Sequence, residues 1–73
     1  MRLTELKKDI DGKILCIESE STLKERLLEI GFSKGTIINF KYEFNTTFAF
    51  KIKNSLVALR KEDAEKIYIE VPA

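Results

Sequence analysis

STLKERLLEIGFSKGT, residues 21–36, predicts a short helix together with both of its ends and the turn that follows. Thr22 is expected to act as the N-cap, and Glu25, three residues later, completes a capping box. Gly31 is expected to take the left-handed conformation that ends a helix in a Schellman motif. The stretch therefore predicts one helix over residues 22–30 that stops abruptly.

One face of this predicted helix is apolar. Leu23, Leu27 and Ile30 share a stripe at helical spacing, so the helix is expected to lie across an apolar surface. Leu28 lies about 100° away from the stripe, among charged side chains, which makes it a candidate contact for a partner protein. Leu27 borders the same candidate patch. The alternative is that Leu28 packs under Phe32 at the end of the helix.

Length and composition predict one small domain over residues 1–73. A single cysteine excludes an internal disulfide, and no apolar stretch is long enough for a signal core or a membrane span, so a cytoplasmic location is expected. Thirteen basic and twelve acidic side chains give no basic footprint for nucleic acid. Histidine is absent, which removes the commonest general base and metal ligand.

The remaining sequence predicts a mainly β protein. After residue 35 the apolar period changes from 3.6 to 2, so Ile38, Phe40, Tyr42 and Phe44 are expected to share one face of a strand. Five short strands and one inserted helix favour a small, strongly bent SH3-like barrel, whose closure removes exposed edges. The predicted strands cover residues 13–18, 36–44, 47–53, 56–60 and 67–71, with a helical turn at 61–66.

Residues before the first strand have simpler expected roles. Leu3 and Leu6 are expected to pin the N-terminus onto the barrel. Gly12 is expected to take a positive φ in a tight turn. Asp9 and Asp11 resemble the opening of a calcium loop, but the later oxygen ligands are missing.

The hairpin between the second and third strands offers a second candidate surface. Phe44 and Phe48 flank its tip and are candidate anchors for a partner or for weak self-association. The alternative is that both rings cap the open end of the barrel. A third surface consists of Lys41, Lys51 and Lys53, which is more typical of a solvated face than of a binding site.

No constellation predicts catalysis or a metal site. Cys16 has no histidine to activate it and is expected to sit in or near the sheet. Glu18 and Glu20, with the aspartates near residue 10, offer only oxygen ligands. Arg60 is expected to form a local ion pair rather than to act on a GTPase in trans. The sequence thus predicts a protein without catalytic residues, metal ligands or cofactor.

Long motifs in this sequence resemble the FeoA family of ferrous iron transport accessory proteins. The specific parts are residues 26–36, with RLLEIGF followed by GT, and residues 58–64, with ALR followed by Ala64; the resemblance covers nearly the whole chain. One departure lies at the hairpin tip, where residues 43–48 replace the Pro-rich tip that family members usually show.

This resemblance implies an SH3-like barrel, a cytoplasmic location and a non-enzymatic role. It implies a partner, the membrane ferrous iron transporter FeoB, so that any contact with the membrane is indirect. Transition metal binding is implied only as a general property of the family, and no residue of this sequence is assigned to it. A free-standing accessory protein is expected rather than the related C-terminal domain of metal-dependent repressors. The alternatives are an SH3-like adaptor that binds peptides or itself, and an SH3-like partner of such a repressor.

Overall fold

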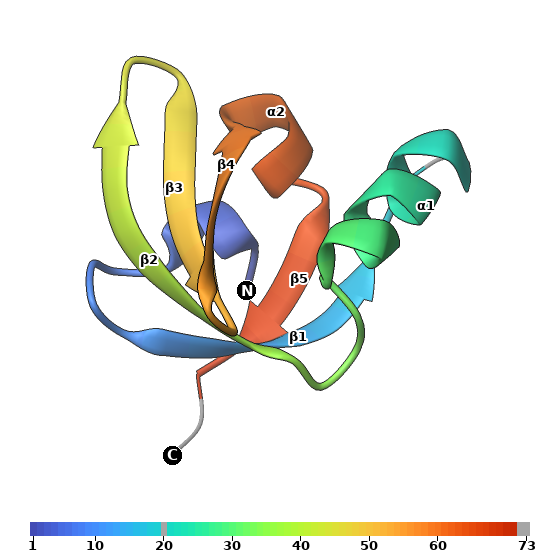
Figure 1. Ribbon diagram of the computed structural model, residues 1–73, viewed down its shortest axis with the longest axis horizontal. Coiled ribbons are helices and arrows are strands. Elements are labelled where there is room, and N and C mark those ends of the chain that lie inside the picture. The colour runs from blue at the N-terminus through green and yellow to red at the C-terminus, as the bar shows by residue number, and fades with distance from the viewer. Residues whose placement is uncertain (20, 72–73) are drawn as a thin grey trace.

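Alternating apolar and polar side chains form five antiparallel strands in one curled sheet, flanked by two helices (Figure 1). The computed structural model describes residues 1–19 and 21–71. The strand order is β4-β3-β2-β1-β5, which confirms the predicted mainly β, SH3-like architecture. The elements are η1 (Leu3–Glu5), β1 (Asp11–Ile17), α1 (Ser21–Ile30), β2 (Ile37–Phe44), β3 (Thr47–Ile52), β4 (Ser55–Arg60), α2 (Lys61–Ala64) and β5 (Ile67–Glu70).

Two-residue turns connect β2 to β3 and β3 to β4. The first residue of each turn has a positive φ, 57° at Asn45 and 55° at Lys53. A left-handed residue at this position matches the turn to the right-handed twist of the strands it joins. The two tight turns therefore fix the register of the β2–β3–β4 meander.

The C-terminal end of α1 is a Schellman motif, as predicted. Gly31 has φ 116°, its N–H donates to the carbonyl of Leu28 at 3.1 Å, and the N–H of Phe32 donates to the carbonyl of Leu27 at 2.9 Å. The N-terminal prediction is wrong, because α1 begins at Ser21 and Thr22 lies inside its first turn. The residue that precedes Ser21 lies outside the described part of the chain.

Replacing Gly31 with L-alanine is expected to cost about 1–2 kcal/mol of stability, because a side chain is strained at this φ. Space is not the cause, since the nearest atom to an added Cβ, Ile52 Cδ1, is 3.6 Å away. Urea unfolding of the variant measures the loss. A synthetic chain with D-alanine at this position is the control, since a D-residue favours positive φ and is expected to retain the stability. Equal losses from both alanines would contradict this explanation.

The core lies inside the curled sheet and is closed by the N-terminal segment and α1. Leu3 and Leu6 are buried, so they hold the N-terminus against the sheet as predicted. Leu27 is buried and Leu23 is half-buried, but the prediction for Ile30 is wrong because this side chain is exposed. Since α1 reaches the core mainly through Leu27, its last turn extends past the buried region. The other core residues are Ile14, Ile17, Phe32, Ile38, Phe48, Phe50, Ile52, Leu59, Ala64, Ile67 and Ile69.

A bulge in β2 changes which side chains face the core. Phe40 pairs with Phe50, but the next pair is Tyr42 with Ala49, which leaves Lys41 as the extra residue. Beyond the bulge, the alternation of side chains between the two faces of the sheet is shifted by one residue. Tyr42 and Phe44 therefore lie on the outer face of the sheet, and the prediction that they share the face of Phe40 is wrong.

Gly12 also differs from its prediction. It lies within β1 and has no positive φ; Asp9 makes the preceding turn with φ 62°. A Cβ at Gly12 would lie 2.9 Å from Ile69 Cδ1 and 3.3 Å from Leu6 Cδ2. The glycine thus allows the N-terminal segment and β5 to approach β1 closely.

The two edge strands of the sheet, β5 and β4, differ in whether another segment pairs with them. The N-terminal residues pair with β5: the N–H of Ile69 donates to the carbonyl of Met1 at 2.7 Å, and a bridge joins Arg2 to Tyr68. No strand pairs with the other side of β4 within residues 1–19 and 21–71. The expected closure of the barrel is therefore incomplete at β4. In the same residues, no helix is both long and apolar enough to cross a membrane.

Candidate functional site

The four residues predicted to contact a partner separate into two buried and two exposed side chains. Leu27 and Phe48 belong to the core, so neither offers a surface to another protein. Leu28 is 43% exposed and Phe44 is 70% exposed. Leu28 lies on α1 and Phe44 at the end of β2, so the two belong to different faces (Figure 1).

Leu28 borders a depression of about 230 Å³ between α1 and β1. We call this the Leu28 surface, and it is lined by Ile14, Leu15, Cys16, Ile17, Lys24, Leu28, Phe32 and Lys34. Its lining is mostly apolar, with two lysines. Leu28 and Phe32 line the same depression, yet Leu28 keeps its exposure, so it is not covered in the way that the alternative predicted. The geometry suits an apolar side chain with acidic neighbours.

Several residues of the Leu28 surface were not identified from the sequence. Leu15, Cys16 and Lys34 join it only because α1 lies over β1. One signal was present: the first strand carries apolar residues on successive positions, which indicates that both of its faces are covered. Cys16 lies in β1, as expected, and it is exposed.

At the hairpin tip, the aromatic side chains have different roles. The Phe48 ring lies 5.6 Å from that of Phe40 and 6.3 Å from that of Phe50, measured between centroids, and these rings form an aromatic cluster inside the sheet. Tyr42 and Phe44 lie on the outer face instead. Phe44 is thus the exposed aromatic side chain of the predicted pair.

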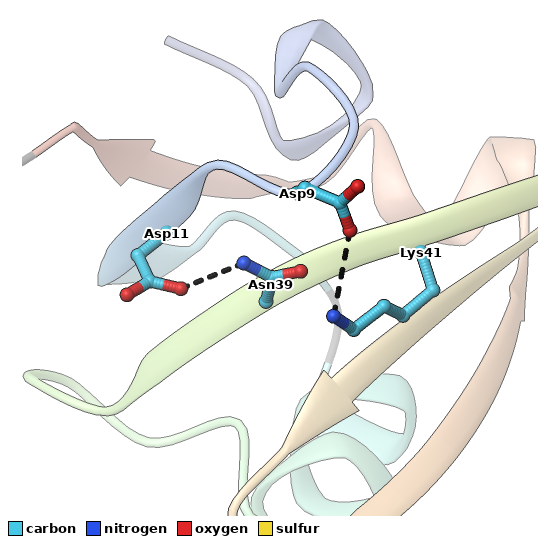
Figure 2. A network of polar contacts seen from close by, with 4 residues as sticks. All are labelled: Asp9, Asp11, Asn39 and Lys41. Carbon is cyan, nitrogen blue, oxygen red and sulfur yellow. Dashed lines mark hydrogen bonds and ion pairs between the residues drawn. The ribbon is translucent and has the colours of Figure 1, made fainter.

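The lysine face forms an open depression of about 560 Å³, and its polar contacts are local (Figure 2). Asn39 donates from Nδ2 to Asp11 Oδ1 at 2.7 Å, and Lys41 Nζ lies 3.5 Å from Asp9 Oδ1. These contacts tie β2 to the first residue of β1 and to the turn that precedes it. The depression is lined by Asp11, Thr36, Ile37, Asn39, Lys41, Lys51 and Lys53.

These contacts also occupy the aspartates that resemble a calcium loop. In residues 1–19 and 21–71, no three carboxylate, thiol or imidazole side chains gather as they would around a metal ion. Glu20, a member of the predicted carboxylate set, lies outside the described residues. Arg60 Nη1 lies 3.7 Å from Glu62 Oε1, which confirms the predicted local ion pair.

Replacing Asn39 with aspartate is expected to destabilise the protein by about 1 kcal/mol, because the hydrogen bond to Asp11 becomes a contact between two carboxylates. Urea unfolding at neutral pH measures this loss. The double variant Asp11→Asn with Asn39→Asp exchanges donor and acceptor, and it is expected to recover most of the stability. If the double variant were as unstable as the sum of the single variants, the pair would not be coupled.

The comparisons with a family model and with solved structures agree on one family. The model of the FeoA domain matches residues 1–71. No curated protein sequence matches the chain. Solved structures of FeoA and iron(II) transport proteins resemble it.

The FeoA protein from Chlorobium tepidum is 21% identical, with a TM-score of 0.92, over 100% of this chain and 71% of that chain. The iron(II) transport protein A from Clostridium thermocellum is 30% identical, with a TM-score of 0.89, over 97% of this chain and 45% of that chain. FeoA from Stenotrophomonas maltophilia, solved with zinc and described as an SH3 domain protein, is 20% identical. Its TM-score is 0.85, over 96% of this chain and 89% of that chain.

The likenesses at 20% and 21% identity establish the fold, whereas the family match extends over nearly every residue. The expected resemblance is thereby confirmed. The chain belongs to the FeoA family, and this membership implies a small accessory role in ferrous iron transport.

Proposed function

We propose that this protein is a non-enzymatic, cytoplasmic accessory factor that binds the cytoplasmic part of the membrane ferrous iron transporter FeoB. Its membership of the FeoA family carries the proposal. FeoA from Stenotrophomonas maltophilia is described as a candidate activating factor of ferrous iron transport, and the same kind of role is proposed for this chain. The protein acts by contact, and the transporter moves the iron.

The Leu28 surface is the proposed contact. Leu28 is an exposed aliphatic side chain beside a mostly apolar depression, which is the arrangement that supports a binding hot spot when a partner excludes water from it. Lys24 and Lys34 line the same depression and favour acidic residues at the edge of the partner's interface. The Schellman motif holds the last turn of α1, so Leu28 is presented on an ordered backbone.

The test is a titration of the ¹⁵N-labelled protein with the cytoplasmic part of the transporter from the same organism, with GDP and with a GTP analogue. Amide shifts are expected in β1 and across residues 24–34, with smaller changes in β3 and β4. Absence of binding in both nucleotide states, in this titration and in a pull-down of the full-length transporter, would contradict the proposed function. Shifts confined to the hairpin tip would move the contact to Phe44.

A further inference from the structure

β4 is an edge strand whose outer side is open. The opposite edge, β5, is covered by Met1 and Arg2, as described above. Outside the ladder with β3, Leu56 and Ala58 make no backbone hydrogen bond within the described part of the chain. In Figure 1, β4 lies at the front of the curled sheet, and β3 is its neighbour in the strand order.

The register identifies the backbone groups that remain free. Ile52 pairs with Ser55 across the two-residue turn, so these residues form a hydrogen-bonded pair. Hydrogen-bonded and non-hydrogen-bonded pairs alternate along an antiparallel ladder, which makes Leu56 and Ala58 non-hydrogen-bonded to β3. Their N–H and C=O groups, and the N–H of Arg60, therefore point away from the sheet, while the C=O of Arg60 lies at the N-cap of α2. This row of groups is a template for one more strand.

β4 has few of the features that normally block such pairing. Edge strands are commonly protected by charged side chains, proline or a bulge, and the six residues of β4, SLVALR, include only one charged side chain, Arg60 at the last position. Leu56 is 58% exposed and Val57 is half-buried at the border of the core. An added strand would cover apolar surface as well as satisfy the backbone.

The charged side chains of β3, of β4 and of the turn between them are all basic. They are Lys51, Lys53 and Arg60, and the acidic residues nearest in sequence, Glu62 and Asp63, belong to α2, which follows β4. An acidic partner is therefore favoured over a basic one on the outer face of this edge. Lys51 pairs with Leu56 on the outer face, and Arg60 lies on the same face of β4. Arg60 is only partly neutralised by its exposed contact with Glu62.

We propose that β4 receives an extended acidic segment of a protein partner, which adds a sixth strand to the sheet. Acidic side chains on the outer face of that segment would lie beside Arg60 and about 10 Å from β3, within reach of Lys51. A second copy of β4 fits less well, because it would bring another Arg60 to this basic face. The proposal goes beyond the transporter contact, since it does not use the Leu28 surface.

The test uses a capped seven-residue peptide that alternates glutamate with valine, titrated into the ¹⁵N-labelled protein at low salt. Saturable shifts are expected along β4, together with slower amide exchange at Leu56, Ala58 and Arg60. The same peptide with lysine in place of glutamate is expected to bind at least tenfold more weakly. A peptide N-methylated on the residues that donate to β4 is expected not to bind, and this control leaves the protein unchanged.

Substitutions in β4 test the same proposal by changing the protein instead of the peptide. Ala58→Pro removes an outward N–H without removing a bond to β3, so it is expected to fold and to lose peptide binding. Ala58→Ser keeps the N–H and is expected to bind within twofold of the parent. Equal binding of the acidic and basic peptides, no binding of either, or protection of β4 that rises with protein concentration alone would each overturn the proposal. The last outcome would indicate pairing between two copies.

Discussion

Replacing Phe32 with alanine is expected to cost about 3–5 kcal/mol, because the removed ring is fully buried and leaves a cavity beneath the end of α1. A domain of 73 residues has a total stability of roughly 4–11 kcal/mol. The variant is therefore expected to be largely unfolded or only marginally stable at 37 °C. Urea unfolding followed by circular dichroism measures the loss.

The matched control is Phe44→Ala, which removes the same ring from a side chain that is 70% exposed. Its expected effect on stability is within about 0.5 kcal/mol. The comparison shows whether the loss of stability comes from burial of the ring or from the change of residue type. Similar losses in the two variants would mean that the ring at the hairpin tip is buried in solution, and that the outer face of β2 is not as described.

Replacing Leu28 with lysine is expected to weaken the contact with the transporter by about 30-fold, the effect of removing a hot-spot side chain worth roughly 2 kcal/mol. Lysine is chosen because it favours the helix and suits the C-terminal turn of α1, where the helix dipole attracts a cation. The fold is expected to be unchanged, and stability is expected to fall by no more than about 0.5 kcal/mol, because Lys24 lies four residues earlier on the same face. Calorimetry of the variant with the cytoplasmic part of the transporter measures the affinity.

Ile10→Lys is the control for this experiment, because Ile10 is also 43% exposed but lies outside the Leu28 surface. It makes the same change of charge and a similar loss of apolar surface. Its affinity for the transporter is expected to stay within about twofold of the parent. If both variants weakened binding equally, net charge rather than the Leu28 surface would explain the effect.

The elements with local signals were predictable from the sequence. The glycine at position 31 and the apolar residue after it indicate the Schellman motif, which depends on only six consecutive residues. The five strands were predictable to within a few residues. Alternation indicates those at residues 36–44, 47–53 and 67–71, and short apolar runs indicate those at 13–18 and 56–60. The angular position of Leu28 away from the apolar stripe is a property of the helix alone, but whether Phe32 covers this side chain is decided by the structure, in which Leu28 is exposed.

The features set by tertiary packing were not predictable. The bulge at Lys41 shifts the alternation, and no residue type marks it. The sequence predicts a turn at Gly12, whereas the glycine is needed because β5 and the N-terminal segment approach it. The sequence allows Leu27 to belong to the core or to the candidate patch, and only the position of α1 on the sheet decides that it is buried. The open edge of β4 likewise depends on the strand order.

The extra residue in β2 has a consequence for length variation among related chains. Lys41 shares its place opposite Ala49 with Tyr42, so deletion of Lys41 would leave the pairs on both sides intact. The exposed ion pair with Asp9 would be lost, and little else. When such chains are aligned, a one-residue gap is therefore best placed at this position, where the hairpin becomes shorter without any of its aromatic rings changing sides.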